Sequence, residues 1–297
     1  MIHEVLEVNV PYEKAGIEKH SHIATITTYV ALSYKTTPFV TRPFCERKRR
    51  AIILCPGGSY VEVSPREAEP IARQFLSMGF QAFVLDYSTT PDVWPTAILE
   101  LAQAVHMVRT HAEEWNIDAE HIVVCGFSAG GHLAASFGCF WNQPFVYEPL
   151  GLTPEDIRPN GNILSYPVIT SGPFAHRGSF EYLLKNQVTD AWLKTYVPDY
   201  AAATMLEFLS LENQVGSQNP PTFLWHTDDD KLVPVENALL YAMALKKANI
   251  SLEIHIFKRG PHGISLATEE VAEFPEQIVP AVQKWVELAA MWMKDMP

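Results

Sequence analysis

The sequence predicts an α/β fold in which a mainly parallel sheet is covered by helices on both faces. Apolar, strand-like runs alternate with helical patterns along the chain, and this alternation is typical of parallel sheets. The 297 residues are 47% hydrophobic and 19% charged, which is enough to bury one large core. We therefore expect residues 1–297 to form a single α/β domain.

The expected elements can be assigned in order along the chain. Residues 22–34 are rich in Thr, Ile, Val and Tyr, which favours one or two antiparallel edge strands before the parallel sheet. In the helical pattern at 95–115, Ile98, Leu101 and Val105 share one face and are expected to pack on the sheet. Strand-like runs fall at 51–55, 121–125, 161–170, 221–227 and 251–257, and helical patterns at 67–78, 95–115, 131–137, 179–187, 201–215, 234–249 and 280–293.

The sequence Gly-Phe-Ser-Ala-Gly at 126–130 places a serine between two glycines directly after a predicted strand. A serine hydroxyl becomes an effective nucleophile where a sharp strand-to-helix turn presents it to a histidine. The glycines leave room for that turn, and 131–137 is predicted to begin a helix. Ser128 is therefore the candidate nucleophile, and the Ala129 N–H lies at the positive end of the helix. The same five-residue pattern also occurs in ordinary tight turns, so the interpretation depends on the strand before it and the helix after it.

An acid and a histidine follow the serine in the chain order that such a turn requires. A short buried strand leads into Asp228, Asp229 and Asp230, and one of these is the expected acid. His262 stands in a Gly/Pro loop just after another predicted strand, where a catalytic imidazole would be placed. The three aspartates could instead form a solvated loop or hold a cation. Because the run lacks calcium-loop spacing, we expect no metal site.

A second glycine-rich turn ends the strand-like run at 51–55, with the sequence Cys-Pro-Gly-Gly-Ser-Tyr at 55–60. Paired glycines let backbone N–H groups approach a ligand closely, as the second half of an oxyanion hole requires. A plain strand-ending turn is the alternative interpretation.

Six segments together carry a family resemblance. They lie at 55–60, 66–70, 126–132, 221–227, 233–238 and 260–263. Taken together, they resemble the bacterial esterase/lipase group of the α/β-hydrolase superfamily, and more narrowly its acetyl-xylan-esterase-like and feruloyl-esterase-like members. The resemblance implies the α/β-hydrolase fold, with a mostly parallel central sheet of about eight strands, helices on both faces and a small cap insertion.

Carried onto this sequence, the resemblance implies that Ser128 is the nucleophile, Asp230 the acid and His262 the base. Asp230 is preferred because family members commonly place the acid three residues before a Val-Pro pair. Asp228 and Asp229 depart from the family pattern, which has smaller or less acidic residues at those positions.

The oxyanion donors implied by the resemblance are the N–H of Ala129 and the N–H of Gly58 or Ser59. Two departures fall in this turn. Pro56 stands where many relatives carry a histidine, and Ser59 replaces a third glycine. Backbone N–H donors survive both changes, so the oxyanion hole remains an expectation.

The implied activity is hydrolysis of carboxylic esters through an acyl-enzyme, with short acyl esters such as acetylated sugars as the expected substrates and no cofactor. One alternative is a peptidase of the prolyl-oligopeptidase type, although 297 residues leave no room for a preceding propeller-sized domain. The other is a non-catalytic ligand-binding protein of the same fold. Such proteins usually lose a triad residue, whereas all three are present here.

The region from about 140 to 219 has a looser pattern, in which seven prolines interrupt any long helix. This stretch lies between the candidate serine and the candidate acid. We expect it to include a small cap or lid over the catalytic end of the sheet.

Charge and targeting signals exclude several classes of partner. The formal net charge is −12, and the only strong basic run is 47–50, so nucleic-acid binding is not expected. No apolar run approaches the length of a membrane span, and the N-terminus lacks a secretion signal, so a cytoplasmic enzyme is expected. The four cysteines do not suggest a disulfide framework. A homo-oligomer is left open.

Overall fold

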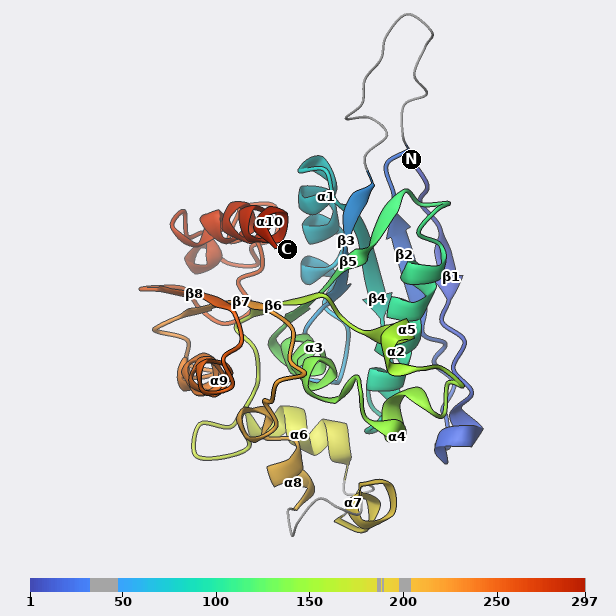
Figure 1. Ribbon diagram of the computed structural model, residues 1–297. Coiled ribbons are helices and arrows are strands. Elements are labelled where there is room, and N and C mark those ends of the chain that lie inside the picture. The colour runs from blue at the N-terminus through green and yellow to red at the C-terminus, as the bar shows by residue number, and fades with distance from the viewer. Residues whose placement is uncertain (33–47, 186–187, 189, 198–203, 297) are drawn as a thin grey trace, which may run out of the picture.

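The computed structural model describes residues 1–32, 48–185, 188, 190–197 and 204–296. Within these residues, eight strands form one sheet (Figure 1). Their bounds are β1 (Val5–Glu7), β2 (Thr25–Tyr29), β3 (Arg49–Cys55), β4 (Gln81–Asp86), β5 (Ile117–Phe127), β6 (Gly161–Ser165), β7 (Thr222–Thr227) and β8 (Leu252–Phe257).

The sheet has the strand order β1-β2-β4-β3-β5-β6-β7-β8. The six strands from β4 to β8 in this order run parallel to one another, whereas β2 is antiparallel to both of its neighbours. Parallel strands end at the same edge, so the loops after β3, β5, β7 and β8 meet there. The prediction of a mainly parallel sheet is confirmed.

Helices cover both faces of the sheet. Helices α1 (Glu69–Ser77) and α10 (Trp285–Asp295) pack into one hydrophobic cluster, and α2 (Thr96–Thr110), α3 (Ser128–Phe140) and α9 (Glu236–Lys247) into the other. The shorter helices are η1 (Tyr12–Ala15), η3 (Pro65–Glu67), α4 (Pro144–Tyr147), α5 (Pro154–Ile157), α6 (Arg177–Leu184), α7 (Asp190–Tyr196), α8 (Met205–Phe208), η4 (Leu211–Asn213), η5 (Pro275–Gln277) and η6 (Val282–Lys284).

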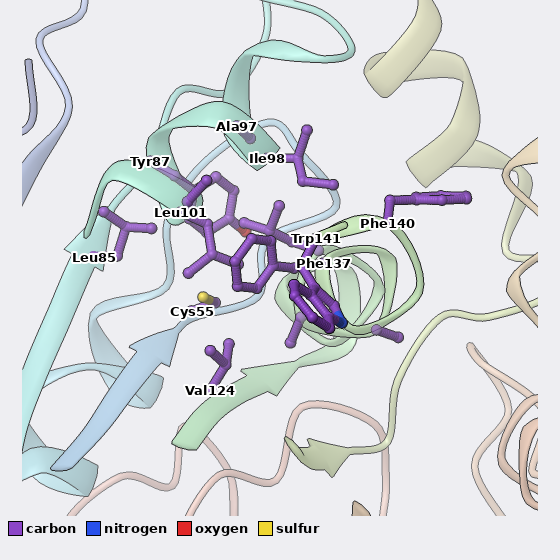
Figure 2. Packing of buried hydrophobic residues seen from close by; sticks show 14 of the residues in the cluster. Cys55, Leu85, Tyr87, Ala97, Ile98, Leu101, Val124, Phe137, Phe140 and Trp141 are labelled. Atoms are coloured by element: carbon purple, nitrogen blue, oxygen red, sulfur yellow. The ribbon is translucent and has the colours of Figure 1, made fainter. Parts of the chain in front are cut away.

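The two clusters arise because successive side chains of a strand point to opposite faces. Along β3, Ile52 and Leu54 join the cluster under α1, whereas Ile53 and Cys55 join the cluster under α2 and α3. Figure 2 shows the second cluster, in which Leu101 and other side chains of the helices lie over the strands. Both faces of β3 are buried, which explains why its sequence is a continuous apolar run.

The structure corrects several predicted boundaries. Within the described residues 22–32, the region predicted at 22–34 supplies one antiparallel strand, β2, as expected, and the edge strand β1 lies outside that range. The strand predicted at 161–170 ends at Ser165, because Tyr166 has a φ of 36°, which no strand adopts. The helix predicted at 201–215 is two short helices, α8 and η4, and its residues 201–203 lie outside the described part. Strand β4 was not assigned individually from the sequence.

The described cysteines Cys55, Cys125 and Cys139 are buried free thiols. Cys45 lies outside the described residues, as does Arg47 of the basic run. In the chain as described, no helix has the length and apolarity needed to cross a bilayer.

The crossover between β6 and β7, residues 166–221, carries α6, α7, α8 and η4. These helices lie together at one end of the molecule (Figure 1). Helix α6 packs against α3, since the ring of Phe180 lies 5.3 Å from that of His132. The crossover therefore sits beside the helix that begins at Ser128.

Candidate active site

Ser128 occupies the junction between β5 and α3. Its φ is 52°, in the left-handed region that residues with a side chain seldom adopt, and it is 7% exposed. The glycines at 126 and 130 permit this turn. A Cβ at Gly126 would collide with the carbonyl of Gly130, and one at Gly130 would collide with the carbonyls of Cys55 and Pro56. The local sequence thus builds a strained turn that presents the serine at the sheet edge.

The structure brings His262 and Asp230 to this serine. The Nε2 of His262 lies 2.7 Å from the Ser128 Oγ, and its Nδ1 lies 2.6 Å from the Asp230 Oδ2. Because an ionised carboxylate can only accept, Nδ1 carries the proton and Nε2 is free to accept the serine proton. Residues separated by 134 and 32 positions in the chain therefore form one hydrogen-bonded line.

Asp230 is held as an anion. Burial alone would raise its pKa, but hydrogen bonds from His226, His262 and the Val233 N–H together hold that pKa well below its usual range. Its Oδ1 also accepts the Leu232 N–H at 2.9 Å. An acid that stays ionised can fix the imidazole tautomer and stabilise the imidazolium.

The neighbouring aspartates have other surroundings. Asp228 and Asp229 are exposed, whereas Asp230 is 5% exposed. Asp229 accepts the Gly260 N–H at 2.7 Å, so it contacts the backbone of the loop that carries His262. Of the three aspartates, Asp230 is the one in contact with the imidazole.

The glycine-rich turn after β3 lies against the nucleophile. An ideal Cβ at Gly57 would lie 3.0 Å from the Ser128 Cβ. Gly58 has a φ of 129° and Ser59 a φ of 55°, so both depart from strand geometry. Within the described part of the chain, the Gly57 N–H donates to a carboxylate, whereas the N–H groups of Gly58 and Ser59 donate to no protein acceptor. The amides of Gly58 and Ser59 thus make no competing hydrogen bond in the described chain, and the Ala129 amide lies in the first turn of α3, where backbone N–H groups have no partner within the helix.

Tyr60 anchors the end of this turn. Its hydroxyl lies 2.9 Å from the His132 Nδ1, while the His132 Nε2 lies 3.0 Å from the Leu209 carbonyl. A carbonyl can only accept, so Nε2 carries the proton and the Tyr60 O–H donates to Nδ1. Burial lowers the pKa of His132 to about 4, so the imidazole is neutral near pH 7.

Four further residues at the site were not identified from the sequence. Glu67 fell within the 66–70 segment without an assigned role, yet its buried carboxylate accepts the Gly57 N–H. Tyr166 contacts the His262 ring edge-on at 5.1 Å. His226 contacts Asp230 at 3.3 Å. Burial and the nearby His262 lower the pKa of His176, at the start of α6. The contacts of Glu67 with Tyr166 and of Tyr166 with His262 join distant segments, so no local pattern could have indicated them, whereas His226 lies only four positions before Asp230.

In the described residues, no group of three or more His, Cys, Asp or Glu side chains is arranged to hold a metal ion. The arrangement of Ser128, His262 and Asp230 can activate a hydroxyl for attack on a carbonyl by proton transfer alone.

Known sequences resemble most of this chain. The BD-FAE family model matches residues 43–245. Endo-1,4-beta-xylanase B of Butyrivibrio fibrisolvens is 35% identical over 232 residues, which cover 75% of this chain and 34% of that protein. Acetylxylan esterase of Xylanibacter ruminicola is 27% identical over 241 residues, which cover 80% of this chain and 45% of that protein. The chain therefore spans between a third and a half of the length of these relatives.

Solved structures resemble almost the whole chain. The acetyl ester-xyloside bifunctional hydrolase of Caldicellulosiruptor lactoaceticus is 33% identical, with a TM-score of 0.78, over 98% of this chain and 95% of that one. The carboxylesterase Cest-2923 of Lactobacillus plantarum is 25% identical, also with a TM-score of 0.78, over 99% and 98% of the two chains.

Proposed function

The chain belongs to the BD-FAE family of α/β-hydrolases, and from this membership we propose that it is a serine esterase that cleaves carboxylic esters. The observation that carries the proposal is the line of hydrogen bonds from Ser128 through His262 to Asp230, with distances of 2.7 and 2.6 Å. The names of the relatives support the same class of reaction, since they include an acetylxylan esterase and a carboxylesterase.

In the proposed mechanism, the Ser128 Oγ attacks the ester carbonyl while the His262 Nε2 takes the serine proton. Asp230 stabilises the imidazolium through Nδ1. The Ala129 N–H, with that of Gly58 or Ser59, binds the oxyanion that forms on the carbonyl oxygen. The imidazolium then protonates the leaving alcohol, and an acyl-enzyme remains on Ser128. Water, deprotonated by His262, attacks this ester; the imidazolium then returns the proton to the Ser128 Oγ as the acyl bond breaks and the acid is released.

We propose short acyl esters, above all acetyl esters of sugars, as the substrates. Two relatives carry names that support this choice: the acetylxylan esterase of X. ruminicola and the acetyl ester-xyloside bifunctional hydrolase of C. lactoaceticus. Residues 166–219 of the crossover, with the short helices α6, α7 and α8, are proposed as the cap that was expected within 140–219. Its side chains would then select the alcohol.

The test compares wild-type protein with Ser128→Ala on three substrates: 4-nitrophenyl acetate, an acetylated xylo-oligosaccharide and a dipeptide amide. We expect acetate release from both esters and its loss in the variant. Faster cleavage of the amide would favour a peptidase. A folded wild-type protein that cleaves none of the three would favour a non-catalytic ligand-binding protein.

A further inference from the structure

Glu67 places a buried carboxylate against Gly57, the residue that packs on the candidate nucleophile. Glu67 is 3% exposed and ends η3. Its Oε2 accepts the Gly57 N–H at 2.7 Å, and an ideal Cβ at Gly57 would lie 2.7 Å from that oxygen and 3.0 Å from the Ser128 Cβ. The carboxylate therefore holds the residue that precedes the two candidate oxyanion donors.

The other oxygen of Glu67 leads to the loop of the base. Its Oε1 accepts the Tyr166 hydroxyl at 2.5 Å, and the Tyr166 oxygen accepts the Ser265 N–H at 3.0 Å. Ser265 stands three residues after His262, and its own hydroxyl donates to the Arg66 carbonyl at 2.6 Å. One carboxylate thus connects the turn after β3, the end of β6 and the loop after β8.

Burial raises the pKa of Glu67, while the hydrogen bonds from Tyr166 and the Gly57 N–H favour its ionised form. Gly57 can only donate through its N–H, and the Tyr166 O–H points to Glu67 while the Tyr166 oxygen accepts from Ser265. Both carboxylate oxygens therefore act as acceptors. Burying an ionised carboxylate is costly unless its bonds are made, and glutamine has only one acceptor oxygen to offer these two donors.

We propose that Glu67 is a positioning residue, which fixes the glycine-rich turn after β3 and the loop that carries His262 in their places around Ser128. This inference rests on the proposed esterase function. Oxyanion donors act on charge that develops only in the transition state, so a displaced turn lowers kcat more than it changes KM. If Glu67 had a purely structural role, its substitution would lower the stability of the fold without lowering kcat more than it changes KM.

The test uses Glu67→Gln, with Glu100→Gln as the matched control. Glu100 is also a buried carboxylate, 0% exposed, and it accepts hydrogen bonds from Ser88 and Tyr12. Neither partner belongs to the candidate site. For Glu67→Gln we expect kcat for an acetyl ester to fall by about 10²-fold with KM changed less than about threefold. For Glu100→Gln we expect a lower unfolding temperature with kcat unchanged.

Tyr166→Phe provides an independent measurement, because it removes the hydroxyl that joins the two loops but keeps the ring against His262. If the network acts as a unit, the double variant with Glu67→Gln is no slower than the slower single variant. If Glu67→Gln fails to fold, a loss of kcat in folded Tyr166→Phe supports the proposal, and an unchanged kcat overturns it.

Labelling of Ser128 by a fluorophosphonate separates this inference from the proposed function. Labelled wild-type protein and slower labelling of Glu67→Gln support the positioning role, whatever ester is hydrolysed. Equal kcat and equal labelling in Glu67→Gln and Glu100→Gln overturn the positioning role alone. Wild-type protein that neither hydrolyses esters nor takes the label overturns both.

Discussion

Asp229 accepts a hydrogen bond from the Gly260 N–H at 2.7 Å, two residues before His262. Adjacent aspartates thus hold the same loop in two ways, since Asp230 contacts the His262 ring while Asp229 contacts the backbone. The division matters because both carboxylates stand in one acidic run, where the resemblance favoured Asp230 only by its spacing from the Val-Pro pair.

Asparagine substitutions at the three aspartates should therefore give unequal losses. Asp230→Asn can favour the wrong imidazole tautomer and should lower kcat by about 10⁴-fold. Asp229→Asn keeps an acceptor for the Gly260 N–H and should lower kcat little. Asp229→Ala loses that acceptor and should lower kcat by less than about 10²-fold. Asp228→Asn is the exposed control. Steady-state kinetics on one acetyl ester decide the assignment, and a crippling Asp229→Asn would show that it is wrong.

Ser128 and His262 should behave as one catalytic unit. Each alanine substitution is expected to lower kcat by on the order of 10⁴-fold or more, and the double variant should be no slower than either single one. Circular dichroism checks that the variants stay folded. Mass spectrometry after fluorophosphonate treatment should find the label on Ser128, and near-wild-type hydrolysis by folded Ser128→Ala would remove the central proposal.

We expect kcat/KM to be higher for esters with short acyl chains than for esters with long ones. A deep apolar channel would add about 0.8 kcal/mol of binding for each buried methylene, so kcat/KM would climb with chain length. We expect the opposite, since the helices of the described part of the crossover are too short to build such a channel. The measurement compares acetyl, butyryl and octanoyl esters of one alcohol. A steady increase through octanoyl would favour a lipase-like acyl channel instead.

The buried His132 should make stability depend on pH. Its pKa is about 4 in the folded chain and near 6.5 when unfolded, so the unfolded chain binds more protons between these values. The contribution of the neutral imidazole is complete above about pH 6.5 and is lost as pH falls towards 4. Relative to His132→Gln, the wild type should lose about 3 kcal/mol of unfolding free energy over that window. Urea unfolding at pH 7, 5.5 and 4 measures it, and a constant difference would contradict the assignment.

Gly130→Ala should disrupt the turn at the nucleophile. The new methyl group would meet the carbonyl oxygens of Cys55 and Pro56, which are backbone atoms and cannot rotate away, so a loss of about 3 kcal/mol or more is expected. Gly178→Ala is the control, because the nearest atom to its methyl group is a His176 carbon at 3.6 Å, an ordinary contact. Alanine should stabilise α6 there. Equal unfolding free energies for the two variants would contradict this account of the turn.

Local sequence patterns were enough to predict the roles of residues that a few neighbouring positions determine. Ser128 follows a strand and precedes a helix, and His262 stands in a Gly/Pro loop after a strand, so the sequence placed both at one sheet edge. Tyr166 is different, because it meets Glu67 across 99 positions of the chain. Its apolar neighbours read as a continued strand, and the positive φ that turns its ring towards His262 leaves no mark in the sequence.

Strands β6 and β7 pair in parallel, from Asn162–Thr222 to Ser165–Trp225, so the crossover leaves β6 at one edge of the sheet and enters β7 at the opposite edge, and the pairing fixes both points. Asn237 further binds the N–H groups of Ile169 and Thr170, so the first residues after β6 are anchored as well. The Leu209 carbonyl is tied to the His132 Nε2 as well, so the part that can be exchanged is the rest of the crossover. Doubling the length of such a loop costs only about 0.6 kcal/mol of closure entropy. New preferences for the alcohol can therefore be acquired there without moving the reacting atoms.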